Sequence, residues 1–312
     1  MENLVINQKG VRLSAEQGRL VIQYPDQSGK QPSSICLQRL KQVVVTACIV
    51  LDSAVLHLLS RKGIHLSFYS PRSTAPVILL SEPAGDVIRR MGQYRGVSEE
   101  ALATRMARAL VRSKLRQQWL WLCQQGQQEG AIAVKQLIGK ISVAERPVLL
   151  GLEANAARTV YQAMASLLPD EWRFSGRNRR PPRDPVNAML SFGSTLIYQQ
   201  AVQALTRQRL DVFAGFYHQP CAGRASLAWD MVELFRPTLE AFIIEQLHKG
   251  HIRQSHFTTT EQDGPVSEGC RFTSEGLGVW FHYWLPLSRI AERRLEKLSL
   301  KWAQAALQYG MG

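Results

Sequence analysis

The first 80 residues alternate short apolar runs with turn residues, a pattern typical of β-strands. The runs are rich in β-branched and aromatic side chains and end at glycine, proline or polar residues. The stretch Asp52–Leu59 has helical spacing instead and begins with residues that can cap a helix. The predicted strands are Leu4–Ile6, Gly18–Tyr24, Val43–Val50, Ile64–Tyr69 and Val77–Leu80. This pattern predicts a small, mostly β domain over residues 1–82.

From about residue 97 the apolar positions recur at steps of three and four, the spacing of amphipathic helices. Prolines and glycines just before that point predict a linker over 83–96. Asp184 followed by Pro185 is a strong helix start, because it combines a capping acceptor with proline at the first helical position. The predicted helices are Ser98–Gln124, Leu149–Leu168, Pro185–Arg207, Ser226–Leu247 (with a bend at Pro237) and Leu287–Gln308. The sequence thus predicts an α+β chain whose larger domain, 97–312, is helical.

Basic residues outnumber acidic ones by 38 to 25, which gives the chain a formal net charge of +13. Such an excess raises the local concentration of phosphate and favours a nucleic-acid partner. The five cysteines form no CxxC pair, so they indicate reduced thiols in a cytoplasmic protein rather than a zinc or redox site. The N-terminus has no signal-peptide pattern. The most apolar stretch, Val43–Leu59, is too short and too polar to span a membrane.

Glu153 lies on the apolar stripe of its predicted helix rather than on the opposite face. A carboxylate in that position must be paired, protonated or bound to a metal, because a lone buried charge is very costly. Two interpretations stay open: a metal ligand, or a buried ion pair with an arginine such as Arg158. The stripe consists of Leu149, Leu150, Ala157, Val160, Tyr161, Met164 and Leu168.

Further metal-type side chains occur between residues 215 and 233. Asp230 and Glu233 share one helix face, where two like charges repel unless a cation lies between them. His218 precedes that helix by a short turn, so the three side chains can converge. Carboxylate oxygens favour Mg²⁺ or Mn²⁺, and imidazole is compatible with Mn²⁺. The alternative is a solvated acidic turn near a helix start, where negative charge is favoured, beside a histidine without a ligand role.

Arginines cluster in the segment that joins two of the predicted core helices. Guanidinium groups can grip phosphate, and the interleaved Trp172 and Phe174 can stack on bases, so we interpret this segment as a nucleic-acid contact. The alternative is a solvated loop. Arg224, in the turn after His218, is a further phosphate-binding candidate, or else a surface arginine. The clustered residues are Arg173, Arg177, Arg179, Arg180 and Arg183, and a helix-spaced stripe of Arg105, Arg108, Arg112 and Arg116 is better interpreted as a solvated face.

Three long motifs follow one another along the chain. They are GLEANAAR at 151–158, RRPPRDPVNAMLSFG at 179–193, and a third at 215–237 that runs from GFYH to GRASLAWDMVELFRP. Weaker matches occur at Arg90–Tyr94 and Phe272–Gly276. Together these motifs resemble the CRISPR-associated integrase/endonuclease family of spacer acquisition, the "Cas one" proteins. The resemblance covers essentially the whole chain, and three ordered motifs are far more specific than any one of them.

The resemblance implies a small N-terminal β-sandwich followed by a larger helical catalytic domain. It also implies a catalytic Mg²⁺ or Mn²⁺ site at Glu153, His218 and Glu233, the last of which is often aspartate in this family. Asp230 matches a further acidic catalytic position, either supporting the site or binding another metal. The resemblance further implies that Asn187 and Arg158, which lie in the same motifs, are supporting residues.

The reaction implied by the resemblance is a transesterification, in which a DNA 3′-hydroxyl attacks a phosphodiester of the repeat array. A metal lowers the pKa of the hydroxyl and neutralises charge on the phosphoryl oxygens. No nucleoside triphosphate is consumed, and the sequence accordingly has no GxxxxGK[ST] loop.

The resemblance also implies the partners. They are a foreign DNA fragment, the CRISPR repeat, a second copy of the chain bound through residues 1–80, and the small protein "Cas two". Two dimers would bridge a dimer of that small protein. Two other functions stay open from the residues alone: a stand-alone metal-dependent nuclease acting on branched or single-stranded DNA, and a non-catalytic DNA-binding scaffold.

Overall fold

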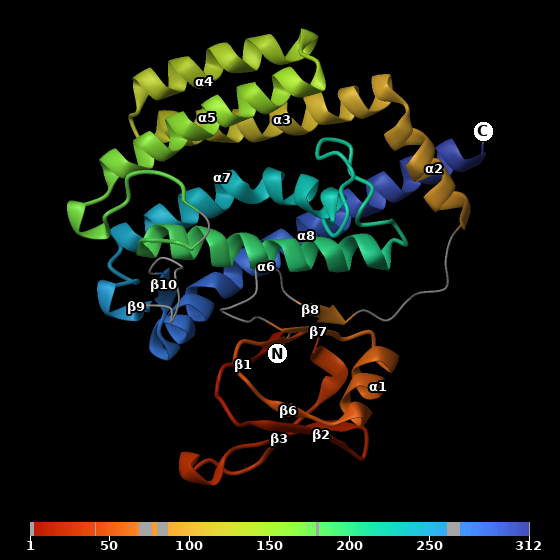
Figure 1. Ribbon diagram of the computed structural model, residues 1–312, viewed down its shortest axis with the longest axis vertical. Helices are drawn as coiled ribbons and strands as arrows, with labels where there is room; N and C mark the ends of the chain where they lie inside the picture. Colours follow the sequence, from red (N-terminus) through yellow and green to blue (C-terminus); the bar gives the residue numbers. More distant parts are fainter. Residues whose placement is uncertain are drawn as a thin grey trace. The chain divides into compact units, whose positions relative to one another are not determined.

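The chain divides into two compact units, Met1–Gly85 and Asp86–Gly312, which are called here the β unit and the helical unit (Figure 1). The structure is a computed structural model and describes residues 3–40, 42–68, 77–79, 87–178, 181–260 and 269–311. The α+β class predicted from the sequence, with strands first and helices after them, is confirmed.

Two four-stranded sheets make up the described part of the β unit. In the first sheet β1, β5 and β7 are parallel and β8 is antiparallel to β7. In the second, β4, β3 and β2 are antiparallel and β6 is parallel to β2. The first sheet contains β1 (Asn3–Ile6), β5 (Gln42–Val45), β7 (His65–Phe68) and β8 (Val77–Leu79), and the second contains β4 (Ser33–Ile35), β3 (Arg19–Gln23), β2 (Arg12–Glu16) and β6 (Val50–Leu51).

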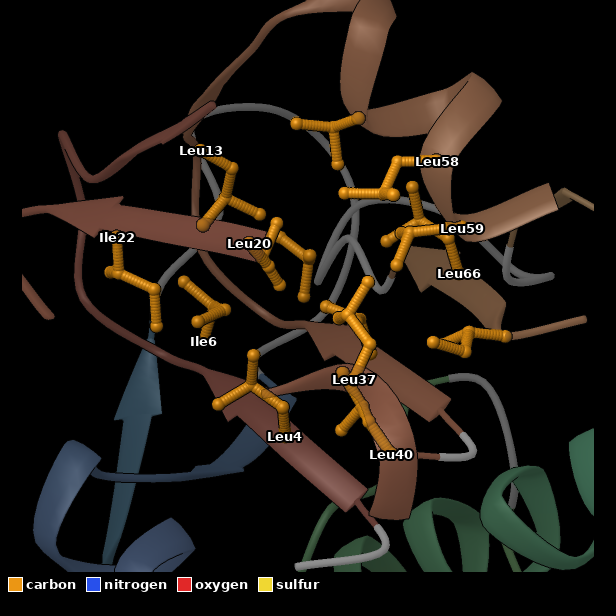
Figure 2. Packing of buried hydrophobic residues seen from close by; sticks show 14 of the residues in the cluster. Leu4, Ile6, Leu13, Leu20, Ile22, Leu37, Leu40, Leu58, Leu59 and Leu66 are labelled. Carbon is orange, nitrogen blue, oxygen red and sulfur yellow. The ribbon is translucent and has the colours of Figure 1, made fainter. Parts of the chain in front are cut away.

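One apolar core joins the two sheets (Figure 2). On β3, Leu20 and Ile22 are buried while Arg19 is exposed, which is the alternation of a strand with one face in a core. Helix α1 (Ser53–Arg61) adds Leu58 and Leu59 to the same core and contacts both β2 and β7. The β unit is therefore a sandwich whose interior is almost entirely aliphatic.

The helical unit is built around α6 and α7, two helices that are buried on nearly every face. Helices that are apolar all round belong in the interior of a protein. Helices α3, α4 and α5 pack against one another, α3 also packs against α7, and α6 packs against α8 (Figure 1). The bounds are α2 (Val87–Ser98), α3 (Glu100–Gln124), α4 (Gln128–Lys140), α5 (Arg146–Leu167), α6 (Pro185–Arg207), α7 (Ser226–His248) and α8 (Ser274–Met311).

The start of α6 lies where the sequence predicts it. The Asp184 carboxylate accepts a hydrogen bond of 2.8 Å from the Asn187 backbone N–H, and Pro185 occupies the first helical turn. Helix α7 continues through Pro237, which has no N–H to donate, so the carbonyl of Glu233 loses its partner in the helical hydrogen-bond pattern.

Several elements differ from the sequence prediction. Most of the predicted linker, 83–96, is helix α2, because the glycines that suggested a linker serve close helix packing instead. Helix α4 was missed because only Ala131 and Val134 of it are buried, too few for a clear apolar stripe. Helix α8 begins 13 residues before the predicted Leu287. The helical unit also contains an antiparallel pair, β9 (Phe257–Thr260) and β10 (Gly269–Phe272). No helix in the described parts of the chain combines the length and apolarity that a bilayer crossing requires.

Helices α2 and α8 approach each other closely at two glycines. A Cβ on Gly92 would overlap the backbone carbonyl oxygen of Ala306, and a Cβ on Gly310 would overlap the carbonyl oxygen of Ile88. Backbone atoms cannot move aside as the end of a flexible side chain can. The two helices therefore require glycine at both positions.

Replacing Gly92 with alanine should separate α2 from α8 and destabilise the chain. We expect Gly92→Ala to lower the free energy of unfolding by about 3 kcal/mol, as overpacked positions typically do. The matched control is Gly139→Ala, an exposed helical glycine with open space around it, which should raise stability by about 0.5–1 kcal/mol. Urea denaturation measures both variants. Equal stability of Gly92→Ala and the unsubstituted protein would contradict the close contact.

Candidate active site

A buried lysine joins the two glutamates that the sequence singles out. The Lys114 Nζ on α3 donates a hydrogen bond to Glu153 Oε1 on α5 and, at 2.5 Å, another to Glu233 Oε2 on α7. Helix α3 packs against both α5 and α7, so a residue on its inner face can reach both. The Lys114 side chain is 1% exposed. The ion pair that the sequence left open for Glu153 therefore exists, but with Lys114 and not with Arg158.

Arg236 completes this group of charges. Its Nε donates to Glu233 Oε1 at 2.7 Å, so each oxygen of the Glu233 carboxylate faces a positive charge. Burial alone would raise the pKa of Glu233, but Arg236 and Lys114 hold it well below its usual range. Burial would likewise lower the pKa of Lys114, yet the charges of Glu233 and Glu153 raise it. Lys114, Glu233 and Arg236 are therefore charged in the folded protein at neutral pH.

Asp230 organises the loop that carries His218. Its fully buried carboxylate accepts hydrogen bonds of 2.7, 3.0 and 2.9 Å from the backbone N–H groups of Phe216, Tyr217 and His218. It also contacts the Nδ1 of His218 at 2.7 Å. A carboxylate on one ring nitrogen fixes the orientation of an imidazole and directs the other nitrogen outward. The Nε2 of His218 is thus the atom that can bind a ligand.

Tyr217 is a buried residue of the loop that carries His218. Burial raises the pKa of Tyr217, and the charges of Glu153, Glu233 and Asp230 raise it further. The Tyr217 hydroxyl is buried, and among the described residues it has no hydrogen-bond partner. This site accordingly has a polar atom free to contact a bound group.

The loop is also tied to elements outside α7. Gln93 on α2, within the weakly matching stretch Arg90–Tyr94, donates to the carbonyls of Asp211 and Ala214 and accepts from the Asp211 N–H. Arg146 on α5 donates to the carbonyl of Phe216 at 3.3 Å. These contacts give the Arg90–Tyr94 stretch a structural role beside the site, which the sequence alone did not reveal.

The donor set fits a divalent cation. Glu153 and Glu233 come from different helices and converge on one positive centre, the Lys114 ammonium, which stands in for a cation between them. With Lys114 in that place, no group of three His, Cys, Asp or Glu side chains in the described part of the chain is arranged to hold a metal. Asp230 has its oxygens bonded to the His218 loop, so the structure gives it contacts with that loop and not with the Lys114 ammonium.

An open cavity of about 470 Å³ leads to this group of charges. The charged residues that line it are Lys114, Glu153, Arg158, Arg177 and Arg236. Tyr161 also faces the cavity, and burial raises its pKa to about 12, so its hydroxyl is protonated at neutral pH. A positively charged cavity next to two carboxylates suits a phosphate group that reacts at a metal.

The structure changes the interpretation of the arginine cluster. Trp172 and Phe174 are buried, with Phe174 packed edge-on against Tyr161, so neither ring can stack on a base as predicted. Both side chains belong to the core, and they hold the loop between α5 and α6 against it.

The arginines of the cluster fall into three groups. Arg177 is half-buried and bonds Asn187 and Ser191, while Asn187 itself holds the loop through Gly176 and Asn178. Arg173 and Arg183 are exposed. Arg179 and Arg180 lie outside the described residues.

Two other arginine predictions are placed as follows. Arg224 donates to the carbonyl of Gln219 at 2.6 Å and to the hydroxyl of Ser226, so it closes its own turn. In the stripe on α3, Arg105, Arg112 and Arg116 are exposed and Arg108 bonds the carbonyl of Ala144, as the solvated-face interpretation expected.

Lys114 and Arg236 are the site residues that the sequence analysis missed. Lys114 lies on the apolar stripe of α3, between Leu110, Val111 and Gln118, where a lysine is unusual. That position was a usable signal for a buried partner of an acidic residue. Nothing in the local pattern indicated that the partner would be shared by two glutamates from two other helices.

Comparisons with known proteins identify relatives of this chain and of its fold. A family profile described as "CRISPR associated protein Cas1" matches residues 4–284. The chain is 29% identical over 277 residues to a CRISPR-associated endonuclease Cas1 of Thermodesulfovibrio yellowstonii, covering 85% of this chain and 86% of that protein. It is 28% identical to another from Thermus thermophilus, covering 80% and 75%.

Solved structures share the fold. A casposase bound to an integration product has a TM-score of 0.84 at 17% identity, and covers 97% of this chain and 91% of its own. A Cas6-RT-Cas1–Cas2 complex gives 0.83 at 24% identity, with 97% and 34% covered. A Cas1 protein from Thermotoga maritima gives 0.81 at 22% identity, with 97% of both chains covered. The family match over nearly the whole sequence is decisive, and the chain belongs to the CRISPR-associated Cas1 family.

Proposed function

We propose that this protein is a metal-dependent DNA endonuclease and integrase that inserts foreign DNA fragments into a CRISPR array by attack of a DNA 3′-hydroxyl. The observation that carries the proposal is the convergence of Glu153 and Glu233 on a single positive centre, next to the His218 loop. Glu153 and Glu233 come from α5 and α7 and supply the oxygen ligands that a hard divalent cation prefers. Relatives named Cas1 endonucleases and a casposase with the same fold support this choice.

Glu153, His218 and Glu233 would hold Mg²⁺ or Mn²⁺ at this site. Such a metal supplies a lowered hydroxyl pKa and neutralises charge on the phosphoryl oxygens. Side chains of the protein would position the reacting groups. Asp230 holds the His218 ring with Nε2 outward, and Arg158 on the cavity wall can orient a phosphate. Asp230 is therefore a positioning residue in this proposal.

The partners follow from charge and from the relatives. A net charge of +13 and a cavity lined with arginines fit DNA. One structure with this fold is a Cas1–DNA complex, and another contains Cas1 with Cas2. We propose that the chain binds both the foreign fragment and the repeat, and that a homodimer joins the small partner Cas2.

Removing the proposed ligands should abolish strand joining without loss of DNA binding. We expect this for Glu153→Ala, His218→Ala and Glu233→Gln, where the single amide oxygen of glutamine can keep one of the two hydrogen bonds from Lys114 and Arg236. The positioning change Asp230→Asn should reduce the rate by about 10- to 100-fold, as substitutions behind a metal ligand do. Denaturing gels would follow joining of a short duplex to a repeat-bearing plasmid with Mn²⁺ and Cas2.

The matched control for these variants is Glu245→Gln, which removes an exposed carboxylate from the same helix as Glu233. It should join DNA at the normal rate. Normal joining by any one of the three ligand variants would exclude that residue from the site. Cleavage without any joined product would favour the stand-alone nuclease.

Exposed arginines of the cavity wall and of the loop between α5 and α6 should bind DNA phosphates. We expect the variant Arg158→Ala/Arg173→Ala/Arg183→Ala to reduce the slope of log affinity against log salt by about 0.7 to 0.9 for each phosphate that is no longer bound. The control pair Arg112→Ala/Arg116→Ala lies on the solvated face of α3 and should leave the slope unchanged. Fluorescence anisotropy at several salt concentrations measures the slope. Equal slopes in the two variants would show that these arginines do not contact DNA phosphates.

The β unit should pair with a second copy of the chain. Strand β6 is a sheet edge, and its Val50 is 54% exposed, which leaves an apolar edge open to pairing. Light scattering should give twice the chain mass of 35.1 kDa for the unsubstituted protein and one chain mass for Val50→Lys. The Val50→Lys variant should no longer join both ends of a DNA fragment, although it should still bind DNA. Gln38→Lys, an exposed change outside the strands, is the control. One chain mass for the unsubstituted protein at every concentration would refute the dimer.

A further inference from the structure

The buried charges of the site include a carboxylate that the proposed reaction does not use. Glu240 lies on α7 seven residues after Glu233, which places both on the same side of the helix. It is 2% exposed, and among the described residues its Oε2 has no hydrogen-bond partner. A buried carboxylate oxygen without a partner is costly, so its retention calls for a physical reason.

Glu240 follows Arg236 by four residues on α7, about one helical turn, so the two side chains are neighbours. Burial raises its pKa, while the positive charges of Lys114 and Arg236 act against that rise. The negative charge of Glu240 in turn raises the pKa of Lys114. Glu240 is thus a second acidic neighbour of the Lys114 ammonium, but one whose hydrogen-bonding capacity is partly unused.

Lys114 blocks the place that a divalent cation would take. Its ammonium is bonded to Glu153 Oε1 and Glu233 Oε2, the same oxygens that a cation between the two helices needs. Both cannot occupy that place, because the lysine charge would then lie against the charge of the metal. The lysine must therefore move, and a buried ammonium that moves needs another acceptor.

We propose that Lys114 is an internal substitute for the metal, which holds Glu153 and Glu233 together in the metal-free protein and turns toward Glu240 when the metal binds. A lysine suits this exchange because its ammonium is a compact charge on a flexible four-carbon stem. The cavity of about 470 Å³ that Lys114 and Glu153 line leaves the site open to an incoming cation. The inference rests on the metal site of the proposed function and adds a competitor and its alternative acceptor.

The exchange predicts opposite effects for the two residues on metal affinity. Lys114→Met removes the competitor, so Mn²⁺ should bind about tenfold more tightly, within the range usual for coupled sites. Glu240→Gln removes the negative charge of the alternative acceptor, so Mn²⁺ should bind about fivefold more weakly. In the double variant Lys114→Met/Glu240→Gln, the second change should have no effect, because no ammonium remains to be displaced. Isothermal titration calorimetry at fixed pH measures all four proteins without DNA.

Two further variants keep the test decisive. Lys114→Arg preserves the buried positive charge, so this variant should fold. Because the planar guanidinium binds carboxylates more strongly than an ammonium does, Mn²⁺ should bind this variant more weakly than the unsubstituted protein. Lys301→Met removes an exposed lysine of α8 and should bind Mn²⁺ normally. As a second readout, Mn²⁺ should raise the melting temperature of Lys114→Met by more than that of the unsubstituted protein.

The outcomes separate this inference from the function on which it rests. Equal or weaker Mn²⁺ binding by a folded Lys114→Met, or tighter binding by Lys114→Arg, would refute the competition. The same effect of Glu240→Gln with and without Lys114 would refute the transfer to Glu240. Absence of Mn²⁺ binding in the unsubstituted protein and in every variant would refute the metal site itself, and the inference with it.

Discussion

The interaction on which the helical unit depends is the bridge that Lys114 makes between Glu153 and Glu233. It connects α3, α5 and α7 at one buried point, and Arg236 balances the remaining carboxylate oxygen. Each charge would be prohibitively costly alone in such a place, so the three helices must pack in the register that brings all of them together. The packing of the three helices and the convergence of the two carboxylates therefore depend on the same set of contacts.

The loop that carries His218 is held in place by hydrogen bonds to its backbone. The residues from Phe216 to His218 form no regular element, and their backbone N–H groups have no helix or sheet to bond. The Asp230 carboxylate accepts from three of them and also fixes the His218 ring. Gln93 and Arg146 bond further carbonyls of the same loop from α2 and α5. The His218 side chain thus has a defined position although it lies on a loop, because the polar backbone of that loop is bonded from several elements.

The two units divide the work in a way that suits an assembly on DNA. The β unit has an aliphatic core and an exposed edge at β6. The helical unit carries the buried charges, the cavity and the exposed arginines. In the proposed function, association through the first unit sets the distance between two active sites, and the second unit performs the reaction.

The sequence by itself determined the family and many of the local elements, although not α2 and α4. Asp184 and Pro185 placed the start of α6, the apolar runs predicted most strands of the β unit, and three ordered motifs identified the Cas1 family. These features are readable because a cap, an alternation or a motif lies within a few consecutive residues.

The tertiary structure alone decided which partner each charge has. Lys114 meets Glu153 across 39 residues of sequence and Glu233 across 119, and Trp172 and Phe174 proved to be buried although their arginine-rich surroundings suggested a surface. Likewise, Gly92 appeared to belong to a linker until the backbone of α8 was seen against it. Such contacts depend on how helices from distant parts of the chain pack together, and no local pattern of residues records that packing.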